Sequence, residues 1–472
     1  MKEIKREKLF IGLFSCILII LGLFQIRLLD YSCFGVEESN YISVANGMLG
    51  RNYNIWNDGV NQTMSHGYSL FLLPVLGLMP SAGLAYKAAV MWNIMCLVFC
   101  YWCMIDLAGF YLKGMTLKKR SILAFLGCLY PSFLYYTQFN LPDIMVMLLF
   151  LLTLVSMHRL YTEDQDQWLI LSALFPVLGM SLSRSMLAVV VSASIFVYRL
   201  AKKRGYSEQR ILTYTGILAG GIALQEIFEI FIRKTFYGYE PGGWFSRFTA
   251  YWDKMQAVFK PNHYLELLYS AGGKLFYVGL ASVLVILPAF FYIGYKIYKR
   301  TCSDLEKVLV FMSVLLLLLA SMEGLSASSL DMIANDRGIL TVLPVWIMLG
   351  LSRWHTDKDW MEAYLGWIFC FLLFTLGAGC IVRYSAQWSM DALRAPLLSL
   401  IYDAAEKNGN VIYLAAVILV LLVFVLLALL NTDIPKIPVQ VKRTGKGISY
   451  GILLFMVLFY AGNSMINVIQ PR

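Results

Sequence analysis

Two adjacent glutamates, Glu37 and Glu38, follow the first apolar run of the chain, within the stretch "DYSCFGVEESNYISVANGMLGRNYNIWNDG" of residues 30–59. Acidic side chains at the start of a helix interact favourably with the helix dipole, and this alone would explain them. Ionisable side chains at or within a bilayer are costly, so they are also candidates for a functional site. The elements that surround the glutamates decide between the two interpretations.

The composition is that of an integral membrane protein. Of 472 residues, 59% are hydrophobic and 14% charged, whereas about 25% are charged in soluble domains. The net charge of +10 comes from short basic clusters between apolar runs, so no nucleic-acid partner is indicated. Most of the nine cysteines lie in apolar runs, where a thiol packs as a small hydrophobe. We therefore expect one polytopic domain over residues 1–472, without a disulfide framework.

The apolar runs predict an all-α protein with about thirteen transmembrane helices, or eleven to thirteen if short ones pair, because a span needs about 20 apolar residues. The run pair around "SLSRSM" is short and predicts a broken or re-entrant element. The predicted helices cover residues 9–29, 82–105, 121–139, 142–157, 168–183, 186–198, 211–232, 274–295, 307–325, 338–352, 361–382, 411–430 and 448–468.

Lysine and arginine predict the orientation, since they accumulate in cytoplasmic loops. The basic clusters fall near residues 2–8, 113–120, 199–210, 296–307 and 436–446, which places the N-terminus in the cytoplasm, on a retained signal anchor. The first outer loop is then 30–66 and the second is 233–274. The second is rich in aromatic residues and glycine, which suits either an interfacial lid or a plain interfacial anchor.

The order of elements in the first outer loop resembles that of the GT-C class of polyprenyl-phosphate-sugar-dependent glycosyltransferases, which includes protein O-mannosyltransferases and the lipid A aminoarabinose transferase. In that class an Asp-Glu-Ala-x-Tyr element opens the loop, a juxtamembrane helix follows, and a Lys- or His-Pro-Pro-x-Tyr segment begins a second apolar helix. The stretch "EESNY", ending at Tyr41, is similar to the first element. The stretch "HGYSL", from His66 through Tyr68, is similar to the second, with both prolines absent.

Three later segments resemble the class in the same order. A Pro-Asp junction at Pro142 and Asp143 lies at the predicted outer surface. The stretch "GMSLSRSML" supplies Arg184, and "NDRGILTVLP" supplies Asp336 and Arg337. The resemblance covers residues 9–352, and it implies outer-face juxtamembrane helices and an undecaprenyl-type carrier if the source is bacterial.

The resemblance implies a membrane glycosyltransferase of the cell envelope, which moves a sugar from a polyprenyl phosphate to a glycan, lipid or protein acceptor at the outer face of the plasma membrane. The lipid phosphate is already a competent leaving group, so the reaction needs charge stabilisation there and a base for the acceptor hydroxyl. The class pattern assigns the base to Glu37 and acceptor or sugar orientation to Glu38, with inversion at the anomeric carbon. Glu38, Asp30 and Asp58 remain alternatives for the base.

The resemblance assigns phosphate binding to three cations, His66, Arg184 and Arg337. Each also has a simpler explanation: interfacial hydrogen bonding for His66, snorkelling for Arg184, and a pair with Asp336 or Asp331 for Arg337. The remaining substrate-binding candidates are Tyr41, Tyr68, Asp143 and Asp336. Farther along, Glu229 and Arg233 are four residues apart and predict a structural pair.

Two other classes of function remain open. The intramembrane charges Glu226, Glu229 and Lys87 would suit a flippase or transporter of a lipid-linked sugar. A polysaccharide polymerase or ligase would share the outer-face chemistry. No metal or other cofactor is indicated, because the four histidines are dispersed, although some relatives in the class bind a divalent cation through outer-loop carboxylates.

Overall fold

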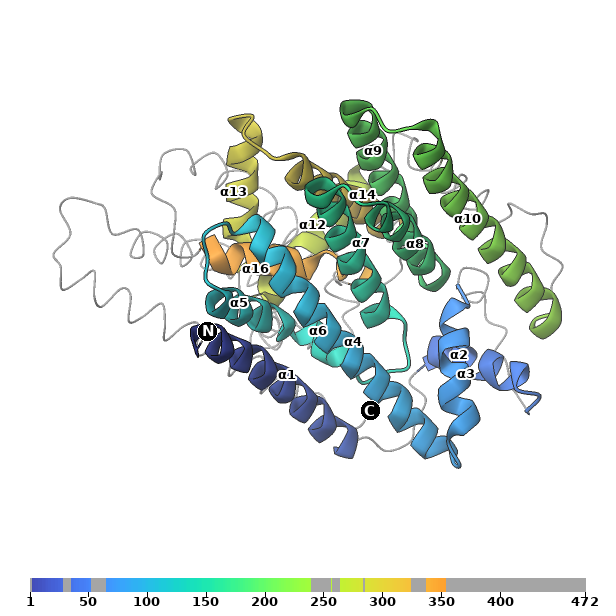
Figure 1. Ribbon diagram of the computed structural model, residues 1–472. Helices are drawn as coiled ribbons and strands as arrows, with labels where there is room; N and C mark the ends of the chain where they lie inside the picture. Colours follow the sequence, from blue (N-terminus) through green and yellow to red (C-terminus); the bar gives the residue numbers. More distant parts are fainter. Residues whose placement is uncertain are drawn as a thin grey trace. The chain divides into compact units, whose positions relative to one another are not determined.

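The computed structural model describes residues 2–28, 35–51, 65–238, 256, 264–282, 285–323 and 337–353. Within these ranges the secondary structure consists of helices and turns (Figure 1). The predicted base alternatives Asp30 and Asp58, the predicted substrate-binding residue Asp336 and the last three predicted spans lie outside the described residues.

The helices follow the predicted apolar runs in order. They are α1 Lys2–Leu28, α2 Gly35–Met48, α3 Gly67–Leu78, α4 Ala82–Tyr111, α5 Leu117–Cys128, α6 Pro131–Tyr136, α7 Asp143–Glu163, α8 Asp166–Leu182, α9 Met186–Arg204, α10 Glu208–Phe236, α12 Tyr264–Ala281, α13 Leu287–Tyr298, α14 Asp304–Glu323, the 3-10 turn η4 Arg337–Ile339 and α16 Leu343–Arg353.

Four helices in the described part of the chain are long and apolar enough to cross a bilayer. They are α4, α7, α10 and most of α14, and four shorter apolar helices accompany them. The chain is thus a multi-pass helical membrane protein. The predicted total of about thirteen spans stays a prediction.

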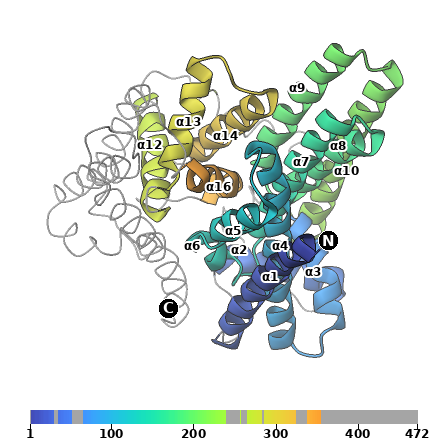
Figure 2. The same cartoon turned by 60° about the vertical axis from the view of Figure 1, so that its left-hand side comes forward.

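The chain divides into two compact units. The described residues of the first unit lie within 1–110, 133–256 and 308–316, and those of the second lie within 111–132, 257–307 and 317–353. In the first unit, α8 packs against α7, α9 and α10, and α2 packs against α3 (Figures 1 and 2).

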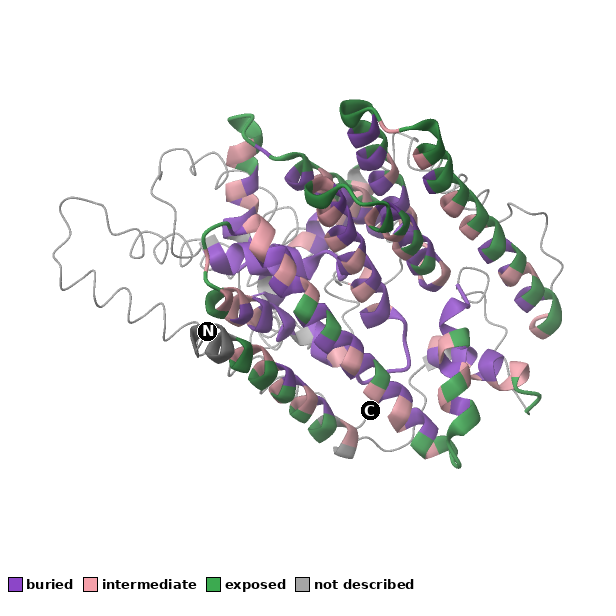
Figure 3. Ribbon diagram, viewed as in Figure 1, coloured by how far each residue is buried: buried purple, intermediate pink, exposed green. Residues whose placement is uncertain are grey.

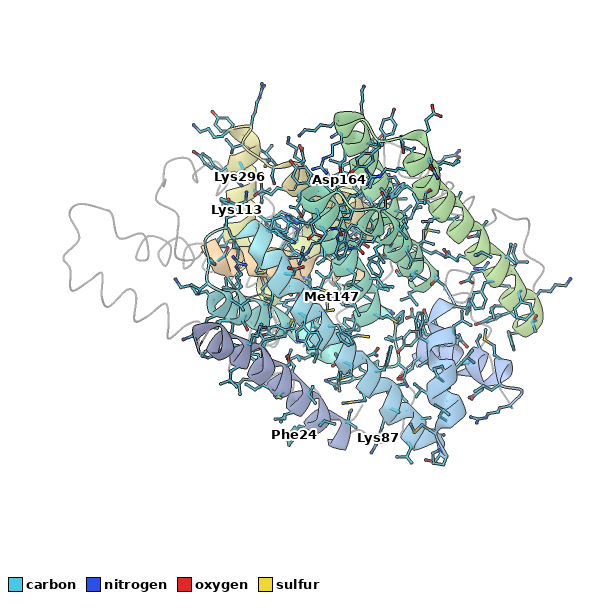
Figure 4. The ribbon with its side chains drawn as sticks, viewed as in Figure 1. Phe24, Lys87, Lys113, Met147, Asp164 and Lys296 are labelled. Atoms are coloured by element: carbon cyan, nitrogen blue, oxygen red, sulfur yellow. The ribbon has the colours of Figure 1, made fainter. Side chains whose placement is uncertain are left out.

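The first two long helices, α1 and α4, run in opposite directions. Trp102 of α4 donates to the hydroxyl of Ser15 at 3.0 Å, while Gly22 of α1 lies against Ile94, so α1 and α4 are antiparallel. Phe24 and Lys87 therefore lie at one end of the unit, and Asp164 lies at the other (Figure 4).

The Asp164 end carries a network of ion pairs. Arg159 of α7 donates to both carboxylate oxygens of Asp106 on α4 at 3.0 Å and to Glu163 at 2.7 Å. These pairs explain why α7 continues beyond the apolar run that predicted its end at residue 157. Burial raises the pKa of Asp164, but the Tyr206 hydroxyl and the nearby Arg210 and Arg204 outweigh burial and hold that pKa below its usual value.

Two predicted single helices are each divided in the structure, and proline explains both corrections. Residues 121–139 form α5 and α6 with a break at Leu129 and Tyr130, because the residue before a proline, here Pro131, avoids helical geometry. Residues 274–295 span the end of α12 and the start of α13, where Pro288 occupies the first turn of the new helix. Because α12 begins at Tyr264, the end of the predicted 233–274 loop is helical.

Candidate functional site

The two glutamates lie in the first turn of α2, in different surroundings. Glu38 is fully buried, whereas Glu37 is partly exposed. Oε1 of Glu38 accepts a hydrogen bond of 2.6 Å from the backbone N–H of Asn140, which belongs to the segment before α7. The main chain therefore fixes the Glu38 carboxylate.

Asn93 of α4 holds the segment that contacts Glu38. Its amide nitrogen donates to the carbonyl oxygens of Phe139 at 2.6 Å and Leu141 at 3.4 Å. Its amide oxygen accepts from the Tyr68 hydroxyl at 3.3 Å. A fully buried side chain with all these partners is rigid, so Asn93 ties α3, α4 and the segment before α7 together.

Tyr41 and Tyr68, both predicted substrate residues, pack edge to face with ring centroids 5.5 Å apart. The hydroxyl of Ser69 donates to the carbonyl of Tyr41 at 3.0 Å, which fixes α3 against α2. With 12 residues, α3 is too short to cross a bilayer. Burial raises the pKa of Tyr68, and the carboxylates of Glu38 and Asp143 raise it further. Four predicted residues, Glu38, Asp143, Tyr41 and Tyr68, thus lie close together.

His66 is fully buried just before α3, and protein groups engage both of its ring nitrogens. Glu229 of α10 accepts from the His66 backbone N–H at 2.6 Å and lies 2.8 Å from Nδ1. Nε2 lies 3.0 Å from the Tyr237 hydroxyl. Burial raises the pKa of Tyr237, and Glu229 adds to the rise. A carboxylate oxygen accepts, so Nδ1 carries the hydrogen of the bond to Glu229.

Gly67, where the class has proline, allows a close approach between α3 and α8. A Cβ on this residue would lie 2.5 Å from the carbonyl oxygen of Ser181 and 2.6 Å from its hydroxyl. This contact brings the end of α8, and the break before α9, next to the start of α3. Arg184 lies in that break, partly buried.

Much of α10 is exposed or partly exposed (Figure 3), and in its C-terminal half most of the buried residues are polar. Gln225, Glu226, Glu229 and Arg233 are all buried on this helix, whereas Leu224, Ile227 and Phe231 are exposed. The Gln225 amide donates to the carbonyl of Met180 on α8 at 2.8 Å. A bilayer-length helix with this pattern faces lipid on one side and a polar interior on the other.

A cavity of about 290 Å³ opens beside these contacts, within the first unit. Residues from α2, α3 and the first turns of α4 line it, together with Arg51, Tyr86 and Asn140. Its volume is near the lower limit for pockets that bind small ligands.

One of the three predicted cations belongs to the second unit. Arg337 lies in η4 of the second unit, partly exposed. In the described part of the chain, no three His, Cys, Asp or Glu side chains are placed to hold a metal ion. The expectation that no cofactor is needed stays a prediction.

Sequence reasoning missed three residues that organise the site, namely Asn93, Asn140 and Arg51. Asn93 is a polar residue in an apolar helix, and that is a usable signal. Asn140 and Arg51 lie in polar connecting segments, where neither residue type is unusual.

No protein-family profile and no curated protein matches the sequence. Among solved structures, the chain is similar to ArnT from Cupriavidus metallidurans in the apo state, with 13% identity, a TM-score of 0.45, and coverage of 96% of this chain and 76% of that one. It is similar to the same protein bound to undecaprenyl phosphate, with 12% identity, a TM-score of 0.45, and coverage of 96% and 77%.

The chain is also similar to an oligosaccharyltransferase from Archaeoglobus fulgidus tethered to an acceptor peptide. That match has 12% identity, a TM-score of 0.38, and coverage of 85% of this chain and 59% of that one. At this level of similarity, a shared activity does not follow from the likeness.

Proposed function

We propose that the protein is a membrane glycosyltransferase that moves a sugar from a polyprenyl phosphate to an acceptor hydroxyl at the outer face of the plasma membrane, with the N-terminus in the cytoplasm. The observation that carries the proposal is the Glu38 carboxylate, which is buried at the start of a juxtamembrane helix and held at 2.6 Å by the Asn140 N–H. Glu38 and Asp143 both lie near Tyr68, which packs against Tyr41, and all four are residues that the sequence resemblance implies.

The chemistry follows from this arrangement. The acceptor oxygen attacks the anomeric carbon and forms the new bond, while its proton passes to Glu38. The bond from that carbon to the phosphate oxygen breaks on the opposite side, so the configuration inverts and polyprenyl phosphate leaves. A carboxylate in a fixed, dry position removes a proton more effectively than one that must be ordered during the reaction.

Burial favours Glu38 over Glu37 as the base. The class pattern suggests the reverse, but Glu37 is partly exposed while Glu38 is inside the cluster. We assign Glu37 to orientation of acceptor or sugar. We assign His66, which contacts Glu229 and Tyr237, to positioning the start of α3. Arg184 and Arg337 remain the candidates for binding the donor phosphate.

Glutamine substitutions test these roles. A panel of undecaprenyl-phosphate-linked sugars is supplied to the purified protein in nanodiscs, and release of undecaprenyl phosphate is measured. Glu38→Gln keeps the size of the side chain and an acceptor for the Asn140 N–H, so we expect a fall in kcat of about 100-fold or more with the fold intact. Glu37→Gln should lower kcat by less than about tenfold.

Two outcomes would contradict the proposal at different levels. If Glu37→Gln is the inactive variant and Glu38→Gln is active, the two roles are reversed. If both variants turn over as fast as the wild type, the proposed function is lost.

A flippase or transporter of lipid-linked sugar is the second candidate, and the observation that favours it is the buried Glu226 on α10. A transporter needs its charges along a path through the bilayer. An inactive Glu226→Ala variant together with a fully active Glu38→Gln variant would select this candidate.

A further inference from the structure

The cavity beside Glu38 combines features that favour an anion with features that favour a hydroxyl. Arg51 follows α2, and its guanidinium donates to the carbonyl of Leu76 on α3 at 2.7 Å, which fixes the side chain at the cavity wall. No carboxylate pairs with Arg51 among the residues that the structure describes. An arginine can donate five hydrogen bonds, so most of its donors remain for a ligand.

The N-terminus of α4 supplies a second positive feature. Ser81 and Ala82 line the cavity, and the Ser81 hydroxyl caps the helix by accepting from the N–H of Leu84 at 3.3 Å. The first N–H groups of a helix lack partners within the helix and carry its positive partial charge, so together they bind phosphate or carboxylate well. This helix is 30 residues long.

Asn140 adds a buried hydrogen-bonding group with unmet capacity. Only 1% of the residue is exposed, it lines the cavity, and its Oδ1 has no hydrogen-bond partner among the described residues. A buried acceptor without a donor is unfavourable, so a ligand that brings a donor is favoured. The backbone N–H of the same residue holds Glu38, which places this group next to the proposed base.

Much of the remaining wall is apolar, although Asn46 of α2 also lines it. Leu72, Leu76 and Met79 line the cavity on the α3 side, and Ala85 and Ala89 line it on the α4 side. Such a wall suits the carbon skeleton of a small headgroup between its charged end and its hydroxyl.

From these contacts we infer that the cavity is the acceptor subsite, and that the acceptor is a phosphate-bearing polyol such as a glycerol phosphate headgroup. The phosphate lies between Arg51 and the N-terminus of α4, one polyol hydroxyl donates to Oδ1 of Asn140, and a second hydroxyl, the one that attacks the sugar, donates to Glu38. The inference that the bound molecule is an acceptor rests on the proposed transferase function. Binding of that molecule to the cavity can be tested without turnover. The phosphate can belong to a membrane lipid or to a free polyol phosphate.

Binding is measured on the full-length purified protein without a sugar donor. Native mass spectrometry compares retention of phosphatidylglycerol with that of phosphatidylcholine, and thermal stabilisation compares sn-glycerol 1-phosphate with glycerol. We expect at least one phosphate-bearing, hydroxyl-bearing probe to bind more tightly than its partner probe. Arg51→Gln should weaken that binding about tenfold or more, whereas Arg51→Lys should keep part of it.

Matched variants separate binding from folding. Asn140→Leu should weaken binding of the same probe, and the unliganded melting temperature of each variant shows whether it is folded. Arg199→Gln removes an exposed guanidinium from the last turns of α9, at the other end of the unit, and should bind like the wild type.

The results then divide as follows. Preference for phosphatidylglycerol identifies a lipid headgroup, and preference for sn-glycerol 1-phosphate identifies a free polyol phosphate; both support the inference. Equal binding of all probes, or unchanged binding by folded Arg51→Gln and Asn140→Leu variants, overturns it. The Glu38→Gln turnover assay is unaffected by that result, so loss of this inference and loss of the proposed function are distinguishable.

Discussion

At the scale of single residues, the contact between His66 and Glu229 joins the first outer loop to the end of α10. One carboxylate accepts from both the backbone N–H and the ring of the same histidine, at 2.6 and 2.8 Å. Both side chains are at most 1% exposed, so water cannot replace either partner. The start of α3 is therefore anchored by a side chain that lies 163 residues farther along the chain.

Removing this carboxylate should destabilise the protein more than an ordinary surface change. In Glu229→Ala the backbone N–H and Nδ1 of His66 lose their acceptor while they remain buried, at a cost of about 3 kcal/mol. The measurement is the apparent melting temperature in detergent. Glu208→Ala, at an exposed position in the first turn of the same helix, is the control. Equal melting temperatures for the two variants would show that the contact contributes little.

Sequence reasoning identified the chemistry-bearing residue types but not their partners. Glu38, Tyr41, Tyr68 and His66 were selected from local order along the chain. Glu229 was expected to pair with Arg233 because helix geometry brings residues four apart together. The structure gives Glu229 a further partner, His66, from another element, and a contact of this sequence separation depends on how helices pack, which local periodicity does not encode.

At the scale of elements, the junction of α3 and α8 depends on one glycine. The carbonyl oxygen of Ser181 occupies the space that a side chain at Gly67 would need. Backbone cannot rotate away as a flexible side chain can, so the two helices would have to separate. Such a separation would move His66 on one side of Gly67 and Tyr68 on the other.

Two glycine-to-alanine changes should therefore have opposite effects. Gly67→Ala overpacks the junction and should destabilise the protein by about 1–3 kcal/mol. Gly220→Ala, in α10, meets nothing within 4 Å, so it should stabilise the helix by about 0.5–1 kcal/mol. Thermal unfolding of both variants in the same detergent measures the difference. A Gly67→Ala variant as stable as the wild type would mean that α3 and α8 can separate without strain.

The sequence also predicted elements better than their ends. Apolar runs located α8 and the starts of α4 and α9 closely, because burial in lipid requires continuous hydrophobicity, but α4 and α9 continue to Tyr111 and Arg204, beyond their predicted ends at residues 105 and 198. The breaks near Pro131 and Pro288 are indicated locally by the prolines themselves. The extension of α7 to Glu163 depends on the ion pairs of Arg159, and the pair with Asp106 of α4 forms only when the helices are assembled.

At the scale of the whole molecule, the two ends of the first unit differ in their chemistry. The end near Lys87 collects buried carboxylates, tyrosines and a cavity, while the end near Asp164 collects exposed ion pairs. This separation agrees with the alternation that the basic clusters predict. The assignment of the Lys87 end to the outer face still depends on the positive-inside rule.

Thiol labelling tests that assignment directly. Leu49→Cys follows α2, at the Lys87 end, and Lys202→Cys lies in the last turn of α9; both positions are exposed. We expect a membrane-impermeant maleimide to label the Leu49→Cys variant in intact cells and the Lys202→Cys variant only after permeabilisation, each compared with the unsubstituted protein. The opposite pattern would invert the topology and place the cavity in the cytoplasm.

Residue 140 presents its main chain to one partner and its side chain to another. Glu38 is held by the backbone N–H, which every amino acid except proline provides, while the side-chain amide lines the cavity. Substitutions at this position can therefore alter which acceptor fits without moving the carboxylate. Under the proposed function, acceptor preference can therefore change at position 140 separately from the base, and a library of substitutions there would vary acceptor specificity while the hydrogen bond to Glu38 is kept.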